Sequence, residues 1–160
     1  MSDLLWDEVR TFFDADLMGQ LPDVQIRGTS VDDWQKLLDL VQSSGWVWEY
    51  LLGQEPAPLP SATEVFTRPA DGEYQELHVY PAAGVLMIFR PLSADQIDFD
   101  MDVRELQGQE GVDLLCEFLT VLGHRLDKSV LMCAEGDYEN PVLGFEVAAD
   151  RVVLLAAPRP

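Results

Sequence analysis

The alternation of apolar and acidic residues in one short stretch constrains the fold of this chain more than any other feature. Residues 97–103 read IDFDMDV, so apolar and aspartate side chains follow one another without a break. This period of two is typical of a half-buried β-strand, whose successive side chains point to opposite faces of a sheet. We therefore predict a strand over 97–103 whose apolar side chains face a core, with Asp98, Asp100 and Asp102 as an acidic ladder on the other face.

The acidic ladder allows three interpretations. Carboxylates two residues apart on one strand lie roughly 7 Å from each other, and they repel unless water, a cation or a basic partner compensates. The simplest interpretation is a solvated face without a partner, which also resists edge-to-edge aggregation. The second is a docking surface for a basic protein, and the third is a Mg²⁺ or Mn²⁺ site of a metal-dependent enzyme. We favour docking over metal catalysis, because only Arg90 and Arg104 are near in sequence to bind a phosphate substrate.

The charge of the whole chain limits its partners. Its 160 residues include 29 acidic and 10 basic residues, which give a formal net charge of -19, and 48% of the residues are hydrophobic. This length and composition predict a single well-filled domain over 1–160. The acidic residues are spread over both halves, so the folded surface itself must be negative. Such a surface repels nucleic acid and anionic membranes and attracts basic proteins or metal cations, although it also serves solubility alone.

Several features favour a cytoplasmic location. Cys116 and Cys133 stand in apolar surroundings, as expected for buried free thiols in a reducing compartment. The first residues lack the basic segment of a signal peptide. No apolar run approaches the roughly 20 residues of a membrane-spanning helix.

Hydrophobic periodicity predicts three helices. A short amphipathic helix is expected over 4–13, and a second over 30–43, where Ser30 and Asp33 resemble a capping box. The longest, over 112–126, has so broad an apolar stripe that we expect it to lie across a sheet, largely covered.

Strands account for most of the remaining chain. Val24 and Ile26 favour a brief extended segment, and the Pro-rich stretch 55–60 is predicted to be a loop within the domain. The predicted strands cover 46–51, 63–68, 75–80, 85–89, 97–103, 130–133, 142–148 and 151–157. Short turns between them imply antiparallel pairing. The expected fold is α+β, with a mostly antiparallel sheet of six to eight strands and helices packed on one face.

Two further groups could contribute to a binding surface. The acidic turn 135–140 supplies Glu135, Asp137 and Glu139; it lacks the ligand spacing of an EF-hand, so we interpret it as a solvated turn. Trp46, Trp48 and Tyr50 share one face of a predicted strand. Exposed, they would form a hot-spot patch for a protein partner; buried, they belong to the core, which we favour.

A small, acidic chain poor in catalytic groups resembles, in composition, immunity proteins and other inhibitors of basic enzymes. Our leading hypothesis is a non-enzymatic protein that binds a basic partner such as a toxin or nuclease, without a cofactor. The predicted partner-binding residues are Asp98, Asp100, Asp102, Glu135, Asp137, Glu139 and Trp48. A metal-dependent enzyme using the aspartate ladder, and a small-molecule pocket between the long helix and the sheet, remain the alternatives.

Overall fold

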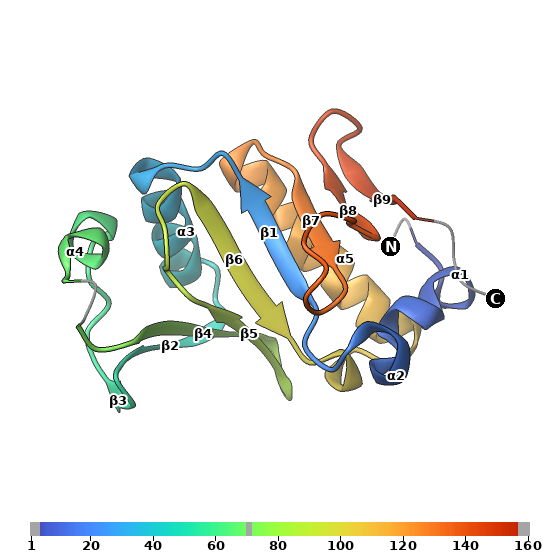
Figure 1. Cartoon of the computed structure of the whole chain (residues 1–160), viewed down its shortest axis with the longest axis horizontal. Coiled ribbons are helices and arrows are strands. Elements are labelled where there is room, and N and C mark those ends of the chain that lie inside the picture. Colours follow the sequence, from blue (N-terminus) through green and yellow to red (C-terminus); the bar gives the residue numbers. More distant parts are fainter. Residues whose placement is uncertain (1–3, 70–71, 157–160) are drawn as a thin grey trace.

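A computed structural model describes residues 4–69 and 72–156 of the chain. Within these residues nine strands form one antiparallel sheet in the order β3-β2-β4-β5-β6-β1-β7-β8-β9, with helices packed against it (Figure 1). The strands are β1 (Asp23–Arg27), β2 (Val47–Leu52), β3 (Glu55–Pro56), β4 (Gln75–Ala82), β5 (Val85–Phe89), β6 (Gln96–Met101), β7 (Val130–Cys133), β8 (Leu143–Glu146) and β9 (Arg151–Leu154). The helices are α1 (Trp6–Val9), α2 (Ala15–Met18), α3 (Val31–Ser43), α4 (Ala62–Thr67) and α5 (Gly108–Leu126), with two 3-10 helices, η1 (Arg10–Phe13) and η2 (Val103–Glu105). The predicted α+β class is confirmed, and the sheet has one strand more than the expected upper limit.

Strand β1 occupies the middle of the sheet although it comes early in the chain. It pairs antiparallel with β6 on one side and with β7 on the other. The strands before α5 and those after it are thereby joined into one sheet. The sequence predicts only a brief extended segment at this position. Its signal there consists of two apolar residues, Val24 and Ile26, which are both fully buried. Five residues carry too short a pattern to reveal a central strand.

The two long helices make the connections that cross the sheet. Because β1 is antiparallel to both neighbours, β6 and β7 run in the same direction, and such a pair needs a crossover connection; α5 provides it. Helix α3 connects β1 to β2, and both helices lie behind the sheet in Figure 1. As predicted, α3 begins with a capping box. Ser30 Oγ accepts from the Asp33 N–H at 3.3 Å, and the Asp33 carboxylate accepts from the Ser30 N–H at 3.1 Å.

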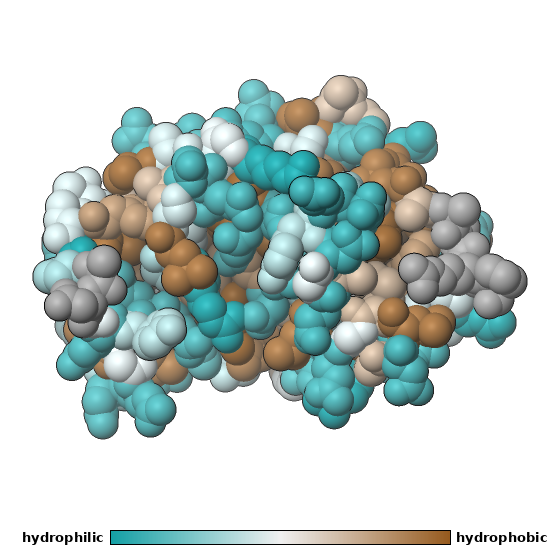
Figure 2. Space-filling view, viewed as in Figure 1, coloured by the Kyte–Doolittle hydropathy of each residue, from teal (hydrophilic) through white to brown (hydrophobic). Residues whose placement is uncertain are grey.

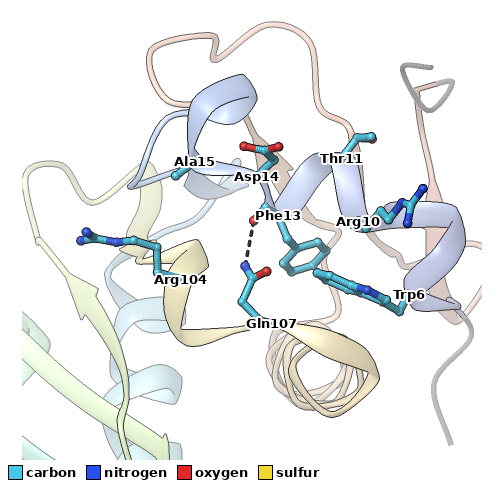
Figure 3. Close-up of a pocket in the computed structure, with 8 residues that line it drawn as sticks. All are labelled: Trp6, Arg10, Thr11, Phe13, Asp14, Ala15, Arg104 and Gln107. Carbon is cyan, nitrogen blue, oxygen red and sulfur yellow. Dashed lines mark hydrogen bonds between the residues drawn. The ribbon is translucent and has the colours of Figure 1, made fainter.

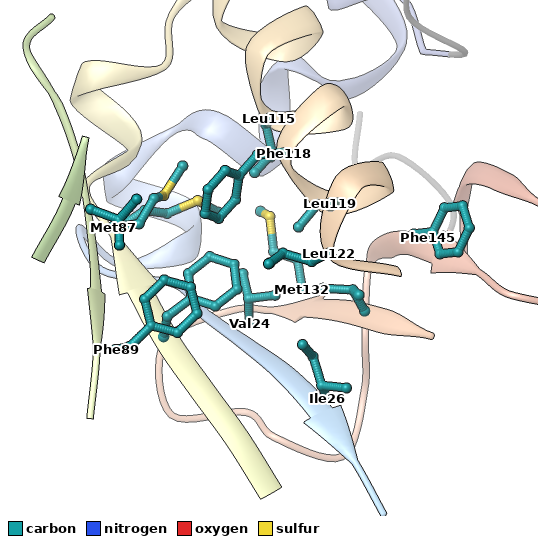
Figure 4. Close-up of a cluster of buried hydrophobic side chains, with 14 of the residues drawn as sticks. Val24, Ile26, Met87, Phe89, Leu115, Phe118, Leu119, Leu122, Met132 and Phe145 are labelled. Carbon is teal, nitrogen blue, oxygen red and sulfur yellow. The ribbon is translucent and has the colours of Figure 1, made fainter. Parts of the chain in front are cut away.

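The core lies between the sheet and α5. Phe118 of α5 contacts three rings, with centroid distances of 4.9 Å to Trp46, 5.5 Å to Phe99 and 6.3 Å to Phe89. Figure 4 shows side chains of α5 meeting those of the sheet throughout this layer. The helix also approaches β8 closely at Gly123, where a Cβ atom would lie 2.1 Å from the Phe145 ring. At one edge of this layer, a hollow of about 280 Å³ lies between α3, α5 and Pro81 of β4.

The strand predicted over 63–68 is wrong, because this segment forms helix α4. Ser61 Oγ accepts from the Glu64 N–H at 3.2 Å, which caps the first turn. Ala62 and Val65, three residues apart, then face the core. The Ser-x-x-Glu capping signal at Ser61 and Glu64 thus prevails over the strand preference of the threonine, valine and phenylalanine that follow.

Several predicted boundaries also need correction. The helix expected over 112–126 begins at Gly108, and the strand expected over 142–148 covers only Leu143–Glu146. The helix expected over 4–13 is broken into α1 and η1, and the strand expected over 97–103 ends at Met101. The Pro-rich loop contains the two-residue strand β3, which pairs with β2. The end of the strand expected over 151–157 lies partly outside the described residues.

The aromatic face of β2 packs toward the helices. Tyr50 is buried, while Trp46 and Trp48 are half-buried and pack against the core. Val47, on the opposite face of the strand, is 69% exposed. This placement agrees with the interpretation of the three aromatic residues as core.

Replacing the central ring of this core should destabilise the protein strongly. We expect Phe118→Ala to lower the free energy of unfolding by about 3–5 kcal/mol, because it removes contacts with three rings and leaves a cavity. Urea unfolding followed by tryptophan fluorescence measures the change. The neighbouring exposed variant Glu117→Ala should stay within about 0.5 kcal/mol of the wild type. A loss below about 1 kcal/mol for Phe118→Ala would contradict the packing described here.

Candidate functional site

The face of the sheet opposite α3 and α5 is open around β1 and β6. Figure 2 views this face and shows hydrophilic side chains gathered over its middle. Alternate residues of β1 and β6 point to the two faces, so their buried apolar side chains meet the helices. Their polar side chains therefore point away from the helices.

Four of these polar side chains form a square across the two strands. Asp23 of β1 is directly paired with Asp100 of β6, and Gln25 of β1 with Asp98 of β6. Directly opposed side chains on antiparallel strands have Cβ atoms roughly 5 Å apart, and like charges at that spacing repel. The square thus concentrates three carboxylates and one amide. Sequence patterning found Asp98 and Asp100 but missed Asp23, because the pairing of β1 with β6 leaves no mark in the sequence.

The three carboxylates of the square are compensated unequally. Asp100 forms an ion pair with Arg90, which also pairs with Glu76 at 3.1 Å. Asp98 accepts a hydrogen bond from Gln96 Nε2 at 2.6 Å, and Asp23 accepts one from the backbone of Gly136. Among the described residues, no arginine, lysine or histidine forms an ion pair with Asp23 or Asp98. These two carboxylates carry charge that the chain itself does not neutralise.

Burial makes this uncompensated charge unfavourable. It raises the pKa of Asp98, against the opposing effect of the hydrogen bond from Gln96. Burial likewise raises the pKa of Asp23; the Gly136 hydrogen bond opposes this, and the nearby charges of Asp100, Asp98 and Glu135 add to it. Perturbed pKa values of this origin are typical of functional sites, although structural networks produce them as well.

The loop between β7 and β8 folds back beside the square. Arg27 Nη2 donates to the Tyr138 carbonyl at 2.8 Å. The Glu135 N–H donates to the Met18 carbonyl at 2.9 Å, and its carboxylate accepts from the Leu21 N–H at 3.0 Å. The pKa of Tyr138 is raised first by the charge of Asp23. Among the acidic residues predicted for this turn, Glu135 lies close enough for its charge to raise the pKa of Asp23.

The other two acidic residues of this turn are exposed. Asp137 accepts from Asn140 Nδ2 at 2.9 Å, and Glu139 lies on the same loop.

Asp102 does not belong to the ladder on β6. It follows the end of the strand and caps η2, where its carboxylate accepts from the Arg104 N–H at 2.9 Å. Arg104 Nη2 also pairs with it at 2.6 Å. These hydrogen bonds with Arg104 hold the pKa of Asp102 below its usual range. Of the predicted acidic ladder, only Asp98 and Asp100 therefore lie on β6. The third carboxylate beside them is that of Asp23 on β1.

Trp48 lies on the other side of the sheet. It is paired with Val79, which is fully buried on the helix-covered face. Trp48 and the square therefore cannot form one continuous surface.

A hollow of about 380 Å³ lies over the square. Its lining consists of Asp23, Gln25, Arg90, Leu92, Gln96, Asp98, Phe99, Asp100 and Tyr138. The loop residue Tyr138 thus forms part of the same concave surface as the carboxylates. This arrangement is suited to holding a cationic group rather than an anion.

A second hollow, of about 430 Å³, lies beside the N-terminal helices (Figure 3). Gln107 Nε2 donates to the Phe13 carbonyl at 2.8 Å and to the Val103 carbonyl at 2.7 Å. Arg104, at its other side, is held by Asp102. These polar groups connect η1 to the start of α5, so we assign them a structural role.

The alternative of a metal centre gains no support from the geometry. In residues 4–69 and 72–156, no group of three or more His, Cys, Asp or Glu side chains is arranged to hold a metal ion. Over the same ranges, none of the helices combines the length and apolar character needed to span a bilayer.

No protein-family model matches this chain, and no curated protein or solved structure matches it either. The function must therefore be inferred from the residues of the chain itself.

Neutralisation of Asp98 and neutralisation of Asp102 should change the free energy of unfolding in opposite directions. The pKa of Asp98 is raised in the folded state, so its charge opposes folding at neutral pH, and this penalty disappears as the pH falls through the raised pKa. The pKa of Asp102 is lowered, so its charge favours folding above the unfolded pKa, and this contribution is lost as the pH falls through the folded pKa.

We therefore expect Asp98→Asn to raise the free energy of unfolding at pH 7 and Asp102→Asn to lower it. Urea unfolding at pH 7 and at about pH 3 measures both effects. The effect of Asp98→Asn should largely vanish at the lower pH, where this carboxylate is protonated. The effect of Asp102→Asn should shrink there, because the carboxylate of the unfolded chain is already protonated. A loss of stability in Asp98→Asn at pH 7 equal to that in Asp102→Asn would contradict the environment assigned to Asp98.

Proposed function

We propose that this chain is a non-enzymatic binding protein that docks a basic protein on the open face of its sheet. The docking surface consists of Asp23, Asp98 and Asp100, with Glu135 at its margin. The observation that carries the proposal is the charge of Asp23 and Asp98, which is half-buried and has no basic partner among the described residues. A partner that brings cations to this surface relieves a repulsion that folding leaves in place.

The charge of the whole chain supports the same type of partner. A formal net charge of -19 produces a long-range field that accelerates the encounter with a basic protein and hinders that with nucleic acid. Acid clustered on an open sheet face then fixes the orientation of the encounter. The solvated-face interpretation accounts for the net charge, but it gives no reason to bury Asp98 and Asp23 partly without a basic partner.

The class of partner that we propose is a basic enzyme such as a nuclease or another toxin, which makes this chain an inhibitor or immunity protein. Enzymes that bind nucleic acid carry basic surfaces, because they must compensate phosphate charge. An acidic sheet face can cover such a surface and exclude the substrate. We place the protein in the cytoplasm, in keeping with its two free, buried cysteines, Cys116 and Cys133.

The proposal predicts that removal of two charges from the docking surface weakens capture of the partner. Immobilised wild type should retain, from lysate of its native cell, a protein with an isoelectric point above roughly 9. The double variant Asp23→Asn/Asp98→Asn should lose most of this retention. With the purified partner, association with the variant should be slower and less dependent on salt, as measured by stopped-flow fluorescence.

A matched control separates the docking surface from the net charge. Glu110→Gln/Glu117→Gln removes the same two charges from exposed positions on α5, behind the sheet. It should retain the partner nearly as well as the wild type. Equal loss in both double variants would show that only the net charge matters, and equal retention in all three proteins would reject the proposed surface.

A further inference from the structure

We propose that the hollow over β1 and β6 binds the guanidinium group of a single arginine side chain supplied by the partner. This inference rests on the proposed function and specifies what the docking surface recognises. The acceptors are the carboxylates of Asp23 and Asp98, the two corners of the square without a basic partner among the described residues.

The geometry of the square suits a planar cation with several donors. Asp23 and Asp98 stand at diagonal positions on neighbouring antiparallel strands, so their Cβ atoms lie roughly 7–8 Å apart. A guanidinium group placed between them can donate to both carboxylates, because its N–H groups point outward in a rigid plane. A compact ammonium group has a shorter reach and binds as a point charge. Asp100 adds negative potential to the hollow while Arg90 holds it in place.

A buried amide provides a second, independent indication of a ligand. Gln25 is only 3% exposed and lines the hollow. Its Oε1 accepts from Arg27 Nε at 3.4 Å, whereas its Nε2 donates to no group among the described residues. The NH₂ group of Gln25 is therefore available to donate to a ligand in the hollow. An arginine that arrives as part of a polypeptide brings a cation for the carboxylates and a backbone carbonyl for Gln25.

The lining of the hollow includes two side chains that can cover a flat cation. Tyr138 is 51% exposed and Leu92 is 73% exposed, and both line the hollow beside the carboxylates. Arginine stacks on aromatic rings more readily than lysine does, because its guanidinium group is planar and weakly hydrated. These contacts favour arginine over lysine as the occupant.

Titration of the isolated protein with small probes tests this inference without the partner. N-acetyl-arginine amide is added to ¹⁵N-labelled protein at low salt, with N-acetyl-citrulline amide as the neutral analogue of the same shape and N-acetyl-lysine amide as the compact cation. We expect the arginine probe to shift the side-chain NH₂ signals of Gln25 and the backbone signal of Tyr138. Its affinity should exceed that of either other probe by roughly tenfold, the effect of one charge-assisted hydrogen bond.

Variants locate the binding and keep the inference falsifiable. Asp98→Asn should weaken the arginine probe by roughly tenfold, whereas Glu117→Gln on α5 should leave it unchanged. Equal binding of the citrulline or lysine probe, or shifts at Gln25 that persist unchanged in Asp98→Asn, would overturn the inference.

Failure of the guanidinium site can be distinguished from failure of the proposed function. A basic protein captured by the docking surface together with no preference for the arginine probe rejects only the guanidinium site. Binding of the arginine probe in the absence of any captured basic protein supports the guanidinium site and rejects the proposed function.

Discussion

The insertion of β1 between β6 and β7 is the constraint on which the rest of this structure depends. The strand pairs on both sides, so it makes one sheet out of the strands that precede α5 and those that follow it. The same register fixes Asp23 opposite Asp100 and Gln25 opposite Asp98 on the open face. On the covered face it places Val24 and Ile26 under the helices. The hydrophobic burial that holds β1 in place therefore also holds like charges together, because the side chains of a strand alternate between the two faces.

The folded state resolves part of this repulsion and leaves the rest. Arg90 neutralises Asp100, and Arg104 neutralises Asp102 beyond the end of β6. Asp23 and Asp98 receive only hydrogen bonds, from the Gly136 backbone and the Gln96 side chain. Those bonds satisfy lone pairs without cancelling charge, so the repulsion persists in the folded chain. A protein can retain such a destabilised feature when its binding function depends on it.

The sequence was informative wherever a pattern is local. The capping box at Ser30 and Asp33, the apolar stripe of α5 and the alternation of β6 all depend on neighbours within a few residues. The α+β class followed from these patterns and from the short turns. The prediction failed at 63–68, where strand-favouring residues indicated a strand and the Ser61–Glu64 cap instead begins helix α4. The site was found only in part because Asp23 and Asp98 are 75 positions apart and meet only through strand pairing, which no periodicity encodes.

The position of the acidic turn depends on both its local composition and its tertiary contacts. Its composition identified Glu135 as a candidate, but composition alone does not place a loop. Hydrogen bonds from Arg27 to the Tyr138 carbonyl and from Leu21 to Glu135 hold the loop beside β1. Arg27 is the last residue of β1 and Leu21 lies just before the strand. The strand that assembles the carboxylates therefore also positions the loop that adds Glu135 and Tyr138 to their surroundings. A single early strand therefore organises the core on one face of the sheet and the candidate site on the other.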